Sequence, residues 1–261
     1  MSIVKRTSRR LHPGHALAIF FSILMLPFLF NQFNYLLASP ATRLQIKENI
    51  IAQTPPIAYA NNTNGEVPFD VYIKPPILIH GCHLLPALFW CLIFPIQFST
   101  RIRLKYLVVH RWLGRIGLGM PLLLGISGIG ITLVKAAYVV ERHLPHQTYF
   151  RLEYINYVLG ARMLVCIYHT YQSARAKQFY THRTWAVRMA ATGYAVVVMR
   201  IFILFYTIWS EVFQYDHRGD INTKELFFGW SAWVATLLSL SVVELYLWHY
   251  GPGTVITNKS A

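Results

Sequence analysis

Four histidines at or near the ends of long apolar segments are the residues of this sequence best suited to chemistry. They are His110, His169, His182 and His249. A neutral imidazole offers one ring nitrogen to a metal, so histidines at facing helix ends can hold a haem iron from both sides. His110 and His182 each precede an arginine, and we predict that they are the axial ligands if haem is present. Binding of another transition metal, or hydrogen bonding to headgroups and water, is the alternative.

Two arginines and a further histidine lie inside apolar segments, where an ionisable group costs free energy and is by default a functional candidate. His83, Arg162 and Arg200 lie roughly 9–12 Å from the outer ends of their segments at the rise of an α-helix, so we predict that they share an outer ligand site. Arginines suit an anionic or carbonyl-bearing ligand, such as a haem propionate or a quinone. A network of arginines and backbone carbonyls is the alternative.

The inner ends of the segments hold a second polar network around the histidines. Arg188 and Glu244 lie at similar depth there, and Glu244 is expected to need a cationic partner. Arg111 and Arg115 belong to the same network. The sequence contains no HExxH pattern, no P-loop and no serine–histidine–acid set, so the chemistry of soluble enzymes finds no support. Whether the chain is an enzyme stays open.

The elements that must position these residues are long apolar segments. The sequence is 55% hydrophobic and only 13% charged, against about a quarter charged in soluble domains. Several segments reach the roughly 20 residues that a helix needs to cross a bilayer. We therefore predict an all-α bundle of six transmembrane helices in a single domain over residues 1–261. The predicted spans lie near residues 17–38, 77–98, 116–139, 154–172, 186–208 and 226–249.

Charge differs sharply between the predicted loops on the two sides. The loops 99–115 and 173–188 are basic without any acidic residue, whereas 39–76 is balanced and 211–225 is net acidic. The positive-inside rule then places both termini and both basic loops on the cytoplasmic or matrix side, and makes 39–76 an extra-cytoplasmic loop. The net charge of +14 is explained by this topology, so nucleic acid is not an expected partner.

The compartment is less sharply indicated. The first apolar run is too long for the core of a signal peptide, so we predict an uncleaved first span, in the plasma membrane or an endomembrane. The basic, acid-free start also fits a mitochondrial presequence, and the mitochondrial inner membrane is the alternative. Asn61 begins a glycosylation pattern that matters only if its loop faces a secretory lumen.

Small residues are frequent in the predicted third span, and this favours close helix packing over contact with a flat ligand. Cys82, Cys91 and Cys166 all lie in apolar segments, and we predict small buried hydrophobes. The order of span, basic loop and His-Arg pair occurs twice, with His110 and His182 separated by 72 positions. Duplication and chance likeness of basic loops explain this equally well.

Residues 77–249 resemble the multi-pass membrane family called domain of unknown function 2306. The resemblance rests on His83, Pro95–Phe98 and His110–Arg115, then on His182, Trp185, Arg188, Tyr194-Ala195 and Arg200, and finally on Trp230, Trp233 and Glu244. It implies a multi-span fold and brings no activity. His169 and His249 have no counterpart in the family pattern. The layout is also similar to that of the six-helix, two-haem ascorbate-dependent cytochromes, as an analogy of architecture only.

Our leading hypothesis is a membrane redox protein, or a subunit of a redox complex, that binds a haem or quinone-like ligand. Haem b is the candidate cofactor, with His110, His182 and His169 on the inner side and with His83, Arg162 and Arg200 on the outer side. A non-redox carrier of protons or small anions and a structural membrane subunit are the alternatives. The expected partners are the lipid bilayer, a small ligand (haem, quinone or anion), and further copies of the chain or other subunits.

Overall fold

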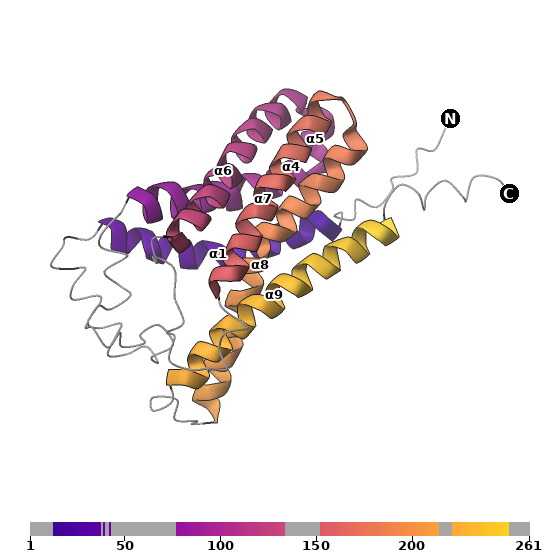
Figure 1. The fold of residues 1–261 in the computed structure, drawn as a ribbon. Helices are drawn as coiled ribbons and strands as arrows, with labels where there is room; N and C mark the ends of the chain where they lie inside the picture. The colour runs from indigo at the N-terminus through magenta and orange to yellow at the C-terminus, as the bar shows by residue number, and fades with distance from the viewer. Residues whose placement is uncertain are drawn as a thin grey trace, which may run out of the picture.

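A computed structural model describes residues 13–37, 39, 42, 77–133, 152–213 and 221–250 (Figure 1). These parts of the chain are helical and contain no strand, which confirms the all-α prediction. The elements are α1 (Pro13–Leu37), the π-helix η2 (Ile77–Leu84), α4 (Leu85–Phe98), α5 (Thr100–Lys105), α6 (Leu107–Leu133), α7 (Leu152–Arg175), α8 (Phe179–Val212) and α9 (Ile221–Tyr250). Most of the predicted loop 39–76, with Asn61, lies outside the described residues.

Four segments of the described chain are long and apolar enough to cross a membrane. They are Gly81–Phe98, Leu107–Leu133, Phe179–Tyr206 and Gly229–His249. Helices of this length and composition indicate an integral membrane protein. The apolar part of α1, Gly14–Phe30, is shorter, and α7 does not meet the same criterion.

The two basic stretches that we predicted as loops are mostly helical, and this prediction is wrong. Residues 100–105 form α5, and α6 begins at Leu107, so His110 lies in its first turns. In the same way, α8 begins at Phe179 and contains His182 and Arg188. Charge alone does not break a helix, because arginine and lysine are good helix formers, and neither stretch contains a proline.

A tight turn of residues 176–178 joins α7 to α8. Lys177 has a positive φ of 57°, the left-handed conformation that commonly follows the end of a helix. The N–H of Lys177 donates to the carbonyl of Ala174 at 3.2 Å, and that of Gln178 donates to Ser173 at 2.9 Å. This is the Schellman pattern, which satisfies the last carbonyls of α7 and sends α8 back alongside it.

The π-helix η2 carries His83 and runs directly into α4. Pro86 stands at the start of α4. Its ring nitrogen has no hydrogen to donate to the carbonyl four residues earlier, which disfavours a continuous α-helix across this point. The wider π turns before Leu85 are consistent with that missing hydrogen bond.

Helices that follow one another in the sequence pack side by side, from α6 to α7, α8 and α9 (Figure 1). The main core lies among α1, α4, α6, α7 and α8. At its centre the Trp90 ring lies 4.5 Å from that of Phe94 and 4.7 Å from that of Tyr194. A smaller cluster, with Ile155 and Ala235, joins α7 and α8 to α9.

Glycines bring α6 and α7 into close contact. A Cβ atom on Gly125 would lie 3.3 Å from the carbonyl oxygen of Gly160, and one on Gly160 would lie 2.7 Å from the Ile129 side chain. Any larger side chain at Gly160 would push the two helices apart. The prediction that small residues of the third span serve helix packing is confirmed at this crossing.

Candidate functional site

Three of the residues that carry the family resemblance lie on successive turns of α8, and each contacts another helix. His182, Trp185 and Arg188 are spaced by three residues, so each is a neighbour of the next on the helix surface and the series winds around α8. His182 and Trp185 face α7, and Arg188 faces α9. The signature therefore fixes α8 between its two neighbours, whatever ligand binds there.

His182 is held by the backbone of α7. Its Nδ1 atom lies 2.9 Å from the carbonyl oxygen of Thr170. A carbonyl only accepts hydrogen bonds, so Nδ1 carries the proton, and in the neutral imidazole Nε2 keeps its lone pair. Metal-binding histidines in proteins are oriented in this way by a backbone carbonyl on the other nitrogen.

His110, in the first turns of α6, lies close enough to His182 for their charges to interact, and Arg103 of α5 lies nearby. The Nδ1 atom of His110 is buried and has no hydrogen-bond partner among the described residues. Gln97 of α4 donates to the backbone carbonyl of His110 at 3.2 Å and fixes the chain at this point. The two histidines predicted as a ligand pair thus lie at the same end of the bundle, each in the first turns of its helix, and their pairing around one ligand stays a prediction.

His169 belongs to the same end of the bundle but makes a different contact. Its ring is stacked on that of Trp185, with centroids 4.3 Å apart and an angle of 17°. The Arg188 guanidinium lies over the Trp185 ring at 4.8 Å, a cation–π arrangement. The stack places His169, which has no counterpart in the family pattern, beside Trp185 and Arg188, which carry the resemblance.

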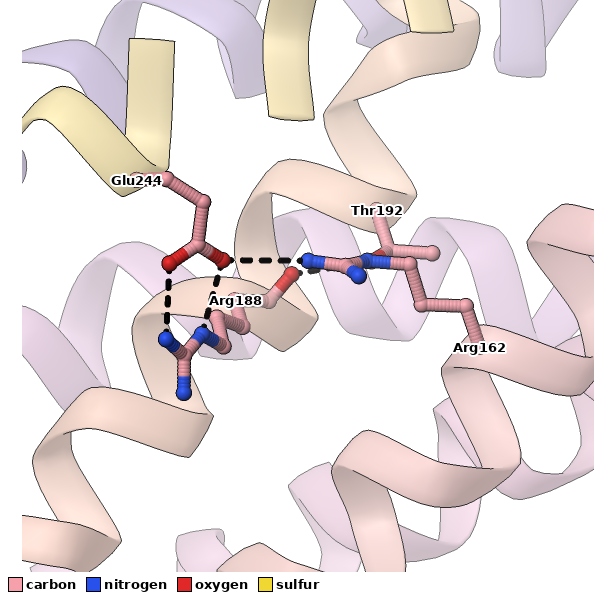
Figure 2. A network of polar contacts seen from close by, with 4 residues as sticks. All are labelled: Arg162, Arg188, Thr192 and Glu244. Carbon is pink, nitrogen blue, oxygen red and sulfur yellow. Dashed lines mark hydrogen bonds and ion pairs between the residues drawn. The ribbon is translucent and has the colours of Figure 1, made fainter. Parts of the chain in front are cut away.

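An ion-pair network joins α7, α8 and α9 (Figure 2). Arg188 donates to both carboxylate oxygens of Glu244, from Nε at 2.8 Å and from Nη2 at 2.7 Å. Arg162 reaches the same carboxylate from the other side, with Nη2 3.4 Å from Oε1. The prediction that Glu244 has a cationic partner is confirmed. The assignment of Arg162 to an outer layer away from Glu244 is wrong.

The three residues of the predicted outer site contact different partners. His83 forms a hydrogen bond of 2.9 Å with Ser127 of α6, and Arg200 lies over the Phe28 ring at 4.4 Å. Arg162 is engaged with Glu244 instead. Sequence reasoning missed Ser127 as the partner of His83, although a hydroxyl in a glycine-rich apolar run is itself a signal.

The other members of the predicted inner network lie at the surface. Arg111 and Arg115 are exposed, and the Arg115 guanidinium lies 4.8 Å from the centroid of the exposed Trp112 ring. His249, at the end of α9, contacts the ring of Trp248. Within the described ranges, no group of three or more histidine, cysteine or acidic side chains is arranged to hold a metal ion. All three cysteines are free, with Cys91 and Cys166 buried.

A separate groove of about 430 Å³ lies between the end of α8 and the start of α9. Six aromatic side chains line it, with no charged residue: Phe202, Phe205, Tyr206, Trp209, Phe227 and Trp230. Aromatic side chains gather at this level in membrane proteins, where the bilayer meets water. The lining of the groove is mostly aromatic, whereas the polar network is charged, and the two share no residue.

Comparison of the chain with protein-family models, with curated proteins and with solved structures finds no match.

Proposed function

We propose that this chain is a membrane redox protein, or a subunit of a redox complex, that binds haem b between His110 and His182. The observation that carries the proposal is the hydrogen bonding of the ring nitrogens of His182 and His110. One has its Nδ1 bound to a carbonyl and its Nε2 available. The other has a buried Nδ1 with no partner in the described part of the chain. A pair of neutral imidazoles is a donor set that suits a haem iron.

Bound haem would supply one-electron transfer, which no side chain of this site can perform. The chain itself contributes orientation and charge. The Thr170 carbonyl fixes the tautomer of His182. Arg188 lies less than two turns further along α8, on the side that faces α9, and places a positive charge near this end of the helix. A quinone could use the same two histidines through hydrogen bonds to its carbonyl oxygens, and is the second ligand to test.

The proposed architecture is six transmembrane helices with both termini on the cytoplasmic or matrix side. α1 and α7 join the four clearly apolar spans, since they have 25 and 24 residues, enough to cross a bilayer. The polar groups of α7 support this because they are paired with neighbouring helices, Arg162 with Glu244 of α9 and Asn156 with Thr132 of α6. Labelling of single cysteines introduced at residues 104 and 176 would place both on the inner face if the topology is right.

Membership in the family called domain of unknown function 2306 is part of the same proposal. Its support is that His182, Trp185 and Arg188, which carry the resemblance, each bind a different group. If these residues resembled the family only by chance, we would not expect each of them to make a specific contact with another helix.

The test is the absorbance spectrum of the full-length protein, purified in detergent after expression with added haem precursor. We expect a Soret band in the wild type and its loss in His110→Ala and His182→Ala. His15→Ala serves as the matched control, because His15 lies in α1 and contributes to neither predicted site. A wild-type protein without a Soret band would refute haem binding, and quinone in its lipid extract would then identify the second ligand.

A further inference from the structure

The network of Arg162, Arg188 and Glu244 holds two positive charges against one negative charge. It lies within or beside membrane-spanning helices, since Arg188 belongs to the span Phe179–Tyr206 and Glu244 to the span Gly229–His249. An uncompensated charge in such a position is costly. A further anion beside the arginines would balance it.

The two arginines differ in their contacts with Glu244. Arg188 satisfies both oxygens of Glu244 through two short hydrogen bonds. Arg162 makes a single contact of 3.4 Å to the same carboxylate, and its Nε atom is buried without a partner among the described residues. A guanidinium has five N–H donors and is always charged. Arg162 is therefore a cation whose donors are largely unused.

The network is reachable from outside the bundle. The side chains of Arg162, Arg188 and Glu244 are 30%, 25% and 46% exposed. Cys166, on the same helix as Arg162, lies near all three charged groups. Thr192 donates to the backbone carbonyl of Arg188 at 2.9 Å (Figure 2). The arginines are thus held on two packed helices beside an open surface.

From this geometry we infer that Arg162, together with Arg188, binds a phosphate or carboxylate group next to Glu244. Planar guanidinium groups recognise both kinds of anion through paired hydrogen bonds. The group could belong to a soluble anion or to a lipid headgroup, which offer the same chemistry. Glu244 orients Arg188 and, because it is negative, also limits the affinity. The site uses no histidine, so it stands apart from the haem proposal.

The experiment measures phosphate binding by full-length protein in nanodiscs of phosphatidylcholine, by titration calorimetry at constant ionic strength. We expect saturable binding by the wild type. Arg162→Gln should weaken it by about 10- to 100-fold, the worth of hydrogen bonds to a charged group. Glu244→Gln should tighten it, because it removes the competing negative charge. Arg101→Gln, a change of an exposed arginine on α5, is the matched control and should bind as the wild type does.

The opposite effects of the two variants separate a binding site from a purely structural network, in which both changes would only loosen the helices. Arg162→Lys keeps the charge and checks that folding is intact, and we expect intermediate affinity. If phosphate does not bind, phosphatidylglycerol is added to the nanodiscs, and stabilisation that depends on Arg162 supports the lipid source. Absence of both effects overturns the inference, as does equal binding by Arg162→Gln and the wild type.

The haem proposal and the anion-site proposal can be refuted independently of each other. His182→Ala should lose the Soret band and keep phosphate binding, whereas Arg162→Gln should keep the band. A protein that binds phosphate through Arg162 and has no Soret band supports the anion site alone.

Discussion

Gly193 of α8 lies against the Trp90 ring of α4, and replacing it by alanine tests how α8 is held. The added Cβ would lie 2.4 Å from Cη2 and 2.6 Å from Cζ2 of Trp90. Carbon atoms prefer separations of about 3.5–4.0 Å, so the ring or the helix would have to move by about 1 Å. Trp90 is only 3% exposed and is packed against Phe94 and Tyr194, which leaves the ring little room.

Overpacking of this kind costs about 1–3 kcal/mol. We therefore expect Gly193→Ala to lower the free energy of unfolding by about 2 kcal/mol, measured by denaturation of the purified protein in mixed micelles. Gly119→Ala is the matched control, because a Cβ at Gly119 meets nothing within 4 Å. It should be neutral or stabilise α6 by up to about 1 kcal/mol, through the better helix propensity of alanine.

A double-mutant cycle with Trp90→Leu identifies the cause. Leucine removes the ring atoms that the new methyl group would meet, so the cost of Gly193→Ala should be smaller in that background. Additive costs would show that the close approach of Gly193 to Trp90 is not what limits this position. A Gly193→Ala protein as stable as the wild type would refute the packing argument itself.

Two further predictions follow from polar contacts between helices. Arg188→Gln should destabilise the protein by about 1–2 kcal/mol, because it removes two hydrogen bonds to a charged group that is partly exposed. Arg162→Gln should cost less, since its single contact with Glu244 is 3.4 Å long; equal costs in denaturation would contradict this ranking. Tyr194→Phe should destabilise by about 1 kcal/mol through loss of the hydrogen bonds of its hydroxyl to Ser22 at 2.8 Å and to the Ala18 carbonyl at 3.1 Å, with a smaller cost when Ser22→Ala is already present.

The all-α fold class could be predicted from the sequence, and so could the placement of His110 and His182 at one end of the bundle. Apolar length fixed the helices, and the position of His110 and His182 at corresponding helix starts placed them at one end of the bundle. The exact partners were not predictable, because a backbone carbonyl such as that of Thr170 leaves no mark in the sequence.

The depth of Arg162 could not be predicted by counting residues. Counting assumes parallel helices and known ends, whereas the described helices differ in length and cross at angles (Figure 1). An arginine side chain is also long enough to reach a partner at another level. Arg162 and Glu244, assigned to opposite layers, are therefore in contact. The loop predictions were wrong for a related reason, since charge reports the side of the membrane and not where a helix begins.

The central claim is that one ligand site lies between His110 and His182, and haem content per chain tests it most directly. Haem is extracted from the purified full-length protein, quantified as its pyridine complex and divided by the protein concentration. We predict one haem per chain in the wild type and none in the His110→Ala, His182→Ala double variant. A wild-type protein without haem after haem-replete expression, or a double variant that keeps its haem, would contradict the account.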